Sequence, residues 1–305
     1  MSLPVSFGGL PWSTPPNFLG IEPEHSDLES SQVLILPVPY EATTSYGGGT
    51  GRGPAAILEA SRYIELYDQE LDSEPYEVGI ATLPYLELSG AGPEAAIREL
   101  RTAYDALLAA YPDRFIITLG GEHSISSAPI LSWADRLAAE GRRLTVLQLD
   151  AHSDLRPEYE GSPYSHASVM HRVHEAGIEI VSAGIRSLTR EERELIAQAD
   201  DLHLFLADDI HSDETWIDEV LSLLGEDVYL TFDVDVFDPS LVPSTGTPEP
   251  GGLGWYPVLK LLRRLFREHR VHAVDIVELA PIPSLHAPDF LVAKLVYKMI
   301  GYRFG

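Results

Sequence analysis

Cysteine is absent from the 305-residue sequence. This absence excludes disulfide bonds and the thiolate zinc sites of zinc fingers, so any metal must be held by His, Asp and Glu side chains. Basic residues are scarce, because 21 Lys and Arg stand against 47 Asp and Glu and give a formal net charge of −26. Since the phosphates of nucleic acid demand a basic surface, we expect no nucleic-acid partner. The acidity favours cationic ligands, or it only keeps the protein soluble.

Long apolar runs are also missing. None approaches the roughly 18 residues that span a bilayer, and the sequence begins without the basic segment of a signal peptide. We therefore expect a cytoplasmic protein without membrane contact. Residues 1–30 are rich in Pro, Gly and Ser and show no periodicity, which predicts an irregular N-terminal arm. No linker or repeat interrupts residues 31–305, which predicts one domain.

Short β-branched runs alternate with amphipathic stretches from residue 31 onward. The expected strands are Val33 to Val38, Val78 to Leu83, Phe115 to Leu119, Leu144 to Leu149, Ile178 to Ala183, Leu202 to Leu206, Val228 to Phe232 and Val271 to Val277. The expected helices are Pro54 to Tyr67, Pro93 to Tyr111, Ser126 to Glu140, Thr189 to Ala199, Ser212 to Leu224 and Tyr256 to His269, with Thr189 and Ser212 as N-caps. Because strands that are apolar on both faces alternate with helices, we expect one α/β domain around a single, mainly parallel, eight-stranded sheet.

Polar side chains follow three of the expected strands. They lie in the motifs GGEHS, DAHSD and TFDVDVFDP and are His123, Asp150, His152, Asp154, Asp233 and Asp235. The carboxyl ends of parallel strands share one edge of a sheet, and residues two apart in an extended segment point the same way. We therefore expect these six side chains to converge.

Four converging aspartates cannot all stay ionised in a protein interior without a positive counter-charge. Two divalent metal ions would supply it. Oxygen ligands with two imidazoles and no sulfur favour Mn²⁺ over Zn²⁺. Two ions roughly 3.5 to 4 Å apart hold a bridging water and lower its pKa, so the expected chemistry is hydrolysis.

Two other motifs admit different interpretations. DVDV matches the strand end of haloacid-dehalogenase-like phosphotransferases, but there it opens the domain, and it leaves DAHSD unexplained. GGGTGRGP, residues 47–54, lacks the Lys-Ser/Thr ending of a phosphate-binding loop, so we expect a flexible loop that leads into a helix. Asp238, before Pro239, is expected to be a turn or cap residue.

The motifs GGEHS, DAHSD, SHAS, TFDVDVFDP and DIVELAP, in this order, resemble those of the ureohydrolases, the family of arginases and agmatinases. The resemblance implies a three-layer α/β/α fold and a ring-like homo-oligomer, a trimer or hexamer. It also implies two Mn²⁺ ions per subunit, one held by His123, Asp150, Asp154 and Asp233 and the other by Asp150, His152, Asp233 and Asp235.

The resemblance also assigns catalytic roles. Glu278 matches the carboxylate that receives the guanidinium, and His166 matches the family's active-site histidine. A hydroxide that bridges the two metals would attack the guanidinium carbon. Asp154 would hold and relay its proton with the assistance of His166, because histidine ordinarily titrates near neutral pH. Which of the two delivers the proton to the leaving amine stays open.

The loop after DAHSD concerns the substrate. Arginases hold the substrate's α-carboxylate there with Asn and Ser, whereas the only Asn in this chain is Asn17. Glu158, Glu160 and the segment GTPEPGGLGW resemble agmatinases, so we expect hydrolysis of agmatine to urea and putrescine, a step of polyamine biosynthesis. Tyr159 and Trp255 either stack on the substrate chain or pack the loop.

Two alternatives remain. Arg156 in the same loop could pair with a carboxylate, which would suit 4-guanidinobutyrate or another guanidino acid. The other alternative is a catalytically silent metal-binding subunit of an assembly.

Overall fold

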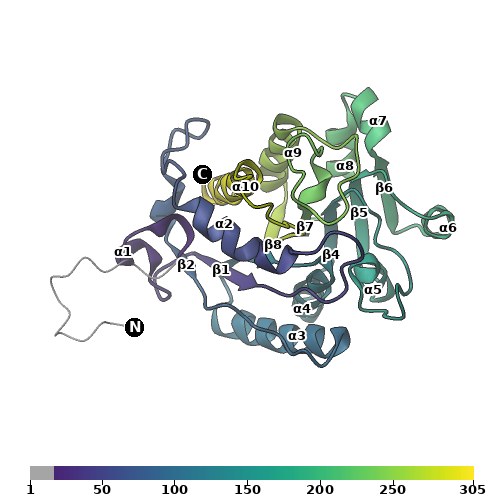
Figure 1. The fold of residues 1–305 in the computed structure, drawn as a ribbon, viewed down its shortest axis with the longest axis horizontal. Helices are drawn as coiled ribbons and strands as arrows, with labels where there is room; N and C mark the ends of the chain where they lie inside the picture. Colours follow the sequence, from purple (N-terminus) through teal and green to yellow (C-terminus); the bar gives the residue numbers. More distant parts are fainter. Residues whose placement is uncertain (1–16) are drawn as a thin grey trace.

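The computed structural model describes residues 17–305, and an eight-stranded sheet runs through its centre (Figure 1). The strand order is β2-β1-β3-β8-β7-β4-β5-β6, and every neighbouring pair is parallel. The expected sheet was mainly parallel and is wholly so. The strands are β1 Val33–Val38, β2 Ile80–Thr82, β3 Phe115–Gly120, β4 Leu144–Leu149, β5 Glu179–Ile185, β6 Leu202–Leu206, β7 Asp227–Asp233 and β8 Arg270–Val277.

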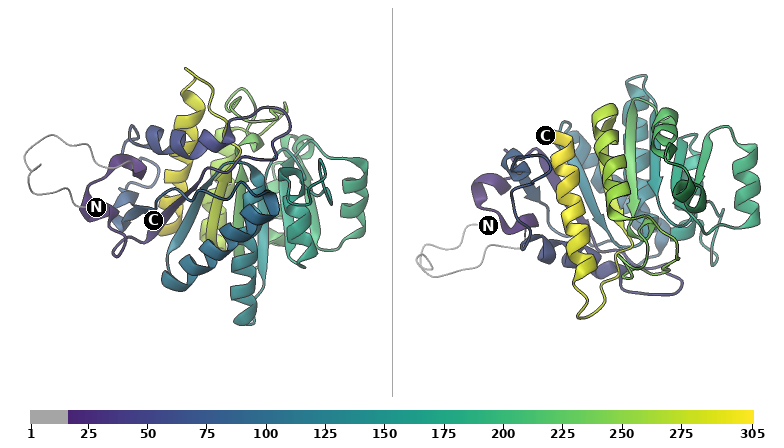
Figure 2. Two further views of the ribbon diagram at one scale, coloured as in Figure 1. Left: turned by 60° about the horizontal axis from the view of Figure 1, so that its bottom comes forward. Right: turned by 90° about the horizontal axis from the view of Figure 1, so that it is seen from above.

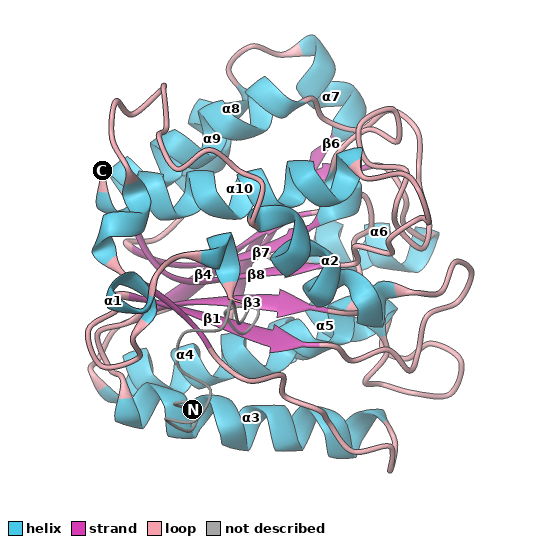
Figure 3. Cartoon of the chain, turned by 60° about the vertical axis from the view of Figure 1, so that its left-hand side comes forward, coloured by secondary structure: helices cyan, strands magenta, loops and turns pink. Residues whose placement is uncertain are grey.

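Helices cover both faces of the sheet and give the three-layer α/β/α architecture (Figures 2 and 3). The α-helices are α1 Pro23–Ser26, α2 Gly53–Ser61, α3 Pro93–Ala110, α4 Ser127–Ala139, α5 Val169–Glu175, α6 Arg190–Gln198, α7 Ala207–Ser212, α8 Trp216–Leu223, α9 Trp255–Glu268 and α10 Ala287–Phe304. Short 3₁₀ turns are η2 Phe18–Gly20, η3 Thr50–Arg52, η4 Pro75–Val78, η5 His123–Ser126, η6 His166–Ser168 and η7 Val234–Val236. Helices α3, α4 and α5 lie on one face, and α2, α8, α9 and α10 lie on the other (Figure 3).

The strands are apolar throughout because each one feeds two cores. In β1, Val33 and Ile35 pack with residues of α2, α9 and α10, whereas Leu34 and Leu36 pack with residues of α3 and α4. This alternation follows from the two-residue period of a strand. Each core is closed by its own layer of helices, which confirms the expected sheet covered on both sides.

Several helix boundaries differ from the expected ones. The capping box of α6 confirms Thr189 as an N-cap, since its side chain accepts from Glu192 N. Ser212 is not the N-cap of α8; it ends α7, and α8 begins at Trp216 after Thr215. The helix expected from Pro54 to Tyr67 ends at Ser61.

Four helices were not expected: α1, which lies in the arm predicted to be irregular, and α5, α7 and α10. Helix α10 escapes a search for amphipathic periodicity because most of its residues are buried, on several sides of the helix. Of the arm expected over residues 1–30, residues 1–16 lie outside the described part. The remainder contains η2 and α1, and Phe18 and Leu19 are buried in the core. Within residues 17–305, no helix is both long and apolar enough to cross a membrane.

A buried ion pair fastens α10 to the segment that follows α2. Lys298 Nζ lies 2.7 Å from Asp68 Oδ1 and 2.8 Å from Glu70 Oε2, and Lys298 and Asp68 are both buried. Burial raises the pKa of Asp68, but the hydrogen bond and charge of Lys298 and two backbone N–H donors outweigh it and hold that pKa below the ordinary 3.8. The ionised pair therefore stabilises the folded state.

We expect Asp68→Asn to lower the free energy of unfolding by about 2 kcal/mol. This is less than the roughly 3 to 5 kcal/mol typical of a broken buried pair, because Glu70 still neutralises Lys298. The folded-state pKa of Asp68 is depressed, so its contribution is present above about pH 4 and is lost as the pH falls through that pKa. Urea unfolding from pH 7 downward should show the difference between variant and wild type narrowing below pH 4.

The exposed pair of Arg264 and Asp218 provides the control. Asp218→Asn should cost less than about 1 kcal/mol, as exposed ion pairs do. Equal losses for the two variants would contradict a structural role for the buried pair.

Candidate metal centre and active site

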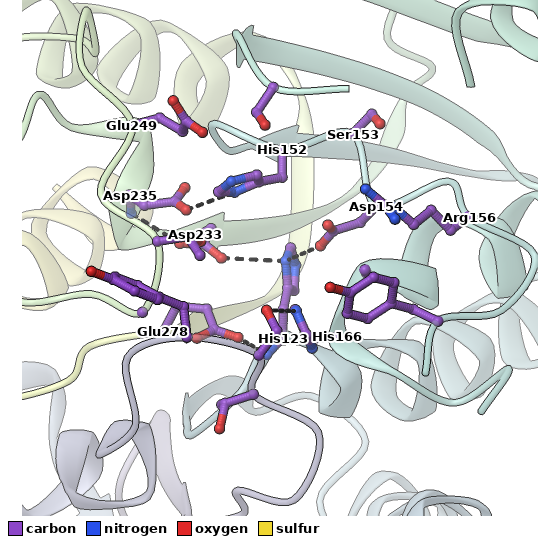
Figure 4. A pocket seen from close by; sticks show the side chains of 18 of the residues that line it. His123, His152, Ser153, Asp154, Arg156, His166, Asp233, Asp235, Glu249 and Glu278 are labelled. Atoms are coloured by element: carbon purple, nitrogen blue, oxygen red, sulfur yellow. Dashed lines mark hydrogen bonds and ion pairs between the residues drawn. The ribbon is translucent and has the colours of Figure 1, made fainter. Parts of the chain in front are cut away.

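The six side chains expected to bind metal meet at the carboxyl edge of the sheet. Figure 4 labels all of them except Asp150. His123 opens η5 three residues after the end of β3, Asp150 follows β4, and Asp233 is the last residue of β7. Glu278 comes directly after β8. Because β3, β8, β7 and β4 are consecutive in the sheet, these four positions lie side by side.

His123 is enclosed by carboxylates. Its Nδ1 lies 3.0 Å from Asp154 Oδ2, 3.1 Å from Asp150 Oδ2 and 3.4 Å from Asp233 Oδ2. This nitrogen is fully buried and makes no hydrogen bond with any described residue. A buried nitrogen with three carboxylate oxygens around it and no hydrogen bond is satisfied by a cation between them, so these residues fit a metal ion.

Hydrogen bonds on the other side of the ring fix the protonation of His123. Thr231 Oγ1 donates to Asp275 Oδ1 at 2.7 Å, so this hydroxyl can only accept from His123 Nε2, 2.8 Å away. Tyr229 donates to the other oxygen of Asp275. With the proton on Nε2, the lone pair of Nδ1 faces the three carboxylates, as metal ligation requires.

A second group of possible ligands adjoins the first one. Asp150, His152 and Asp235 place one ligand atom each within 4.8 Å of the others, and His152 Nδ1 lies 2.9 Å from Asp235 Oδ2. Asp150 belongs to both groups, so two ions bound there would be neighbours.

Without a metal, this cluster has too much negative charge. Burial and the neighbouring charge of Asp235 raise the pKa of Asp150 to about 7. Burial and the same neighbour raise the pKa of Asp233 well above its ordinary value. Burial also raises the pKa of Glu278 to about 8. The carboxylates thus need positive charge at the positions where the two groups meet.

Turns, rather than extended strands, orient most of these carboxylates toward the ligand cluster. Asp235 lies in η7, and Asp154 and Glu278 have φ values of 51° and 65°, in the left-handed region that is costly for residues with a side chain. Asp233 accepts from Asp235 N at 2.9 Å, and Asp235 accepts from Ala151 N at the same distance. The expected two-residue alternation along a strand is therefore not what brings them together.

A cavity of about 270 Å³ opens onto the cluster. His166, Glu278, Arg156 and Tyr159 line it together with five of the six expected ligands, while Asp150 lies fully buried behind them. The Arg156 guanidinium lies 4.7 Å over the Tyr159 ring.

The structure does not bring Glu158 and Trp255 to this cavity. Glu158 is exposed, and the Trp255 ring stacks against Phe237 instead. Asp238 accepts from the backbone N–H groups of Ser240, Gly251 and Gly252, which confirms it as a turn residue.

Two segments far apart in the chain form the rim of the cavity. Gly47 N donates to Gly246 O at 3.1 Å, and a Cβ on Gly47 would lie only 2.8 Å from that oxygen. Ser45 and Tyr46 precede this junction on one side, and Glu249 follows it on the other. Glycine at position 47 is thus what lets the two segments touch.

Sequence reasoning missed several residues that shape the site. Asp275 and Thr231 lie inside the quoted motifs DIVELAP and TFDVDVFDP, but nothing there reveals that they contact each other. Glu122 lies inside GGEHS, and its partners come from a loop about 80 residues earlier. Glu249 lies in GTPEPGGLGW, and only the fold shows that it lines the cavity.

Comparison with known proteins agrees with this geometry. The Arginase family matches residues 31–301. An N(1)-aminopropylagmatine ureohydrolase from Synechocystis is 39% identical over 95% of this chain and 94% of its own length. An agmatinase from Pyrococcus horikoshii is 36% identical over 90% and 93% of the two chains.

Solved structures show the same fold. The agmatine ureohydrolase of Thermoplasma volcanium superposes with a TM-score of 0.80 at 30% identity, covering 90% of both chains. An arginase from Medicago truncatula shares the fold, with a TM-score of 0.74 at 23% identity over 90% of this chain and 88% of its own. The three-layer fold, the buried His and Asp cluster and the match over residues 31–301 lead to one assignment: this chain is a ureohydrolase and belongs to the arginase family.

Proposed function

We propose that this ureohydrolase cleaves the guanidinium group of a substrate that ends in an amine cation, agmatine or N(1)-aminopropylagmatine. The products would be urea and putrescine, or urea and the corresponding triamine. The observation that carries this proposal is Glu249, a half-buried carboxylate on the cavity wall with no hydrogen-bond or ion-pair partner among residues 17–305. The names of the similar proteins from Synechocystis and Pyrococcus horikoshii support both substrates.

Two Mn²⁺ ions would be held by the residues of the two adjoining groups. His123, Asp154 and Asp150 surround one position, and His152, Asp235 and Asp150 surround the other. Asp233 Oδ2 lies 3.4 Å from His123 Nδ1, and this carboxylate would bridge the two ions, as the family motif implies. When bound, such ions supply Lewis acidity and lower the pKa of a water molecule between them.

Glu278 would receive the guanidinium. Its Oε1 accepts from His123 N at 2.6 Å, so the carboxylate is fixed in place beside the ligands. Its other oxygen makes no hydrogen bond with any described residue, and Glu278 lines the cavity. A guanidinium offers parallel N–H donors to such a carboxylate, which would hold the carbon over the metal ligands.

Asp154 and His166 would handle the protons. Asp154 lies against His123 at the base of the cavity, where its carboxylate can take the proton released by the attacking water. His166 lies on the wall, where its ring can assist delivery of a proton to the leaving amine. The C–N bond to the substrate's carbon chain then breaks, and urea remains.

The length of the tail separates the two substrates. In either one, the guanidinium end would occupy the same position at Glu278, and the tail would extend toward the rim formed by Tyr46 and Glu249. The longer N(1)-aminopropylagmatine carries a second amine beyond the first. The ratio of the two kcat/KM values would therefore show which tail length the cavity accommodates better.

A second candidate function is hydrolysis of a guanidino acid such as 4-guanidinobutyrate. Arg156 favours it, because this guanidinium lines the cavity and forms no ion pair with any described acid. Its place over the Tyr159 ring is equally compatible with a packing role.

The first prediction concerns metal. Chelation should abolish urea release, and Mn²⁺ should restore it. We expect Asp235→Asn to lower kcat by at least about a hundredfold, because it removes a negative charge from the cluster. Elemental analysis should find two ions per wild-type chain and fewer in the variant. Asp208→Asn, at an exposed position on α7, is the control. Full activity in metal-free protein would refute the proposal.

The second prediction concerns the tail. Glu249→Gln should lower kcat/KM for agmatine and N(1)-aminopropylagmatine by roughly 10- to 100-fold, the worth of one hydrogen bond to a charged group. The kcat/KM for butylguanidine, which lacks the amine, should be almost unchanged. Uniform losses on all three substrates would show that Glu249 supports the loop rather than the tail.

The third prediction separates the two candidate functions. Arg156→Gln should leave the ratio of agmatine to 4-guanidinobutyrate turnover unchanged if Arg156 only packs on Tyr159. A selective loss of 4-guanidinobutyrate turnover by about tenfold or more, in a wild type that prefers this substrate, would establish the guanidino acid instead.

A further inference from the structure

Glu122 is a fully buried carboxylate that lies next to the ligand cluster without belonging to it. One oxygen accepts from Ala42 N and Thr43 N, both at 2.6 Å. The other accepts from Thr43 Oγ1 at 2.8 Å and Ser124 Oγ at 2.5 Å. Four donors offset the cost of burying this carboxylate. Glu122 thereby fastens the loop after β1 to the edge of the sheet.

The hydroxyl of Thr43 has only one proton, and Glu122 takes it. Toward every other neighbour, Thr43 Oγ1 is therefore an acceptor. It accepts from the backbone N–H of His166 at 3.0 Å. It also lies 3.3 Å from Nδ1 of the His166 ring. An oxygen that can only accept is matched by a proton on Nδ1, whereas a bare Nδ1 would set two lone pairs against each other.

One other hydroxyl approaches the same nitrogen. Ser165 Oγ lies 3.4 Å from His166 Nδ1 and accepts from Ala167 N. Its own proton is free to rotate, so this hydroxyl tolerates either a protonated or a bare Nδ1. Thr43 tolerates only the protonated one. The two contacts together are satisfied by a single tautomer, with the proton on Nδ1.

The opposite nitrogen then carries a lone pair. His166 Nε2 lies 3.5 Å from Ser45 Oγ, and Ser45 and His166 both line the cavity. The Tyr159 and His166 rings pack in a T-shaped arrangement with a centroid distance of 5.7 Å. Nε2 is thus the nitrogen that can take up a proton on the cavity side and then release it.

We propose that Glu122 and Thr43 are positioning residues, which hold His166 as the Nδ1–H tautomer with Nε2 available for proton transfer. The inference rests on the proposed function for its kinetic consequence, but the tautomer can be measured without turnover. Glu122 orients Thr43, Thr43 orients the ring, and neither needs to touch the substrate.

The test replaces the Thr43 hydroxyl and then restores it. Thr43→Val keeps the shape and removes the acceptor, whereas Thr43→Ser keeps the hydroxyl. We expect Thr43→Val to lower kcat for the guanidine substrate about tenfold, a part of the 10²- to 10⁴-fold that general acid–base catalysis contributes, with KM changed less than about twofold. Thr43→Ser should stay within about twofold of wild type in both constants.

The direct readout is the nitrogen-15 NMR spectrum of histidine-labelled protein loaded with diamagnetic Mg²⁺. The chain has 11 histidines, so the His166 signals are assigned by their loss in His166→Gln. Wild type, Thr43→Ser and Ser165→Ala should show a protonated Nδ1 and a bare Nε2. Thr43→Val should show a mixture of tautomers.

The outcomes separate this inference from the proposed function. A proton on Nε2 in the wild type, or an unchanged tautomer in Thr43→Val, would overturn the positioning role whatever the activity is. Absence of urea release from every guanidine, with the expected tautomer pattern intact, would overturn the proposed function and leave the assignment of Thr43 standing. A loss in Thr43→Val that Thr43→Ser shares would indicate a packing effect and contradict the inference.

Discussion

The burial of four aspartates in one place is the constraint on which the rest of the site depends. Asp150, Asp154, Asp233 and Asp235 are almost wholly buried, and the imidazoles of His123 and His152 are the only basic side chains within residues 17–305 that pair with them. Like charges so close together in a protein interior repel strongly. Because β3, β8, β7 and β4 are consecutive in the sheet, the carboxylates at their ends lie close enough to bind the same cations.

The same hydrogen-bond arrangement fixes the protonation of two different histidine rings. At His123, Asp275 takes the proton of Thr231, and at His166, Glu122 takes the proton of Thr43. In both cases a buried carboxylate converts a threonine hydroxyl into a pure acceptor, which then selects one ring nitrogen for protonation. Neither carboxylate is among the expected metal ligands, but each controls which lone pair faces the cavity.

Sequence patterns predicted the strands of the sheet better than the helices that cover it and the residues that support the metal ligands. The bounds of β4 and β6 agree with the expected ones, and in β4 the charged residues Arg143 and Asp150 mark both ends of the apolar run. Parallel strands predict that the motifs share one edge of the sheet, and the order of the strands, with β3, β8, β7 and β4 consecutive, is what brings the side chains together. Helix α10 was missed because a helix buried on several sides shows no amphipathic period. Glu122 and Asp275 were missed because their partners come from other segments, and Asp235 was expected in an extended segment although it lies in η7.

The junction of Gly47 with Gly246 has a consequence for the energetics of recognition. Because two segments far apart in the chain are already joined by a backbone hydrogen bond, the mouth of the cavity is ordered when the protein folds. An incoming molecule then loses little affinity to the ordering of loops. Selectivity among guanidines would therefore depend on how well their tails fit an opening whose shape is set before binding.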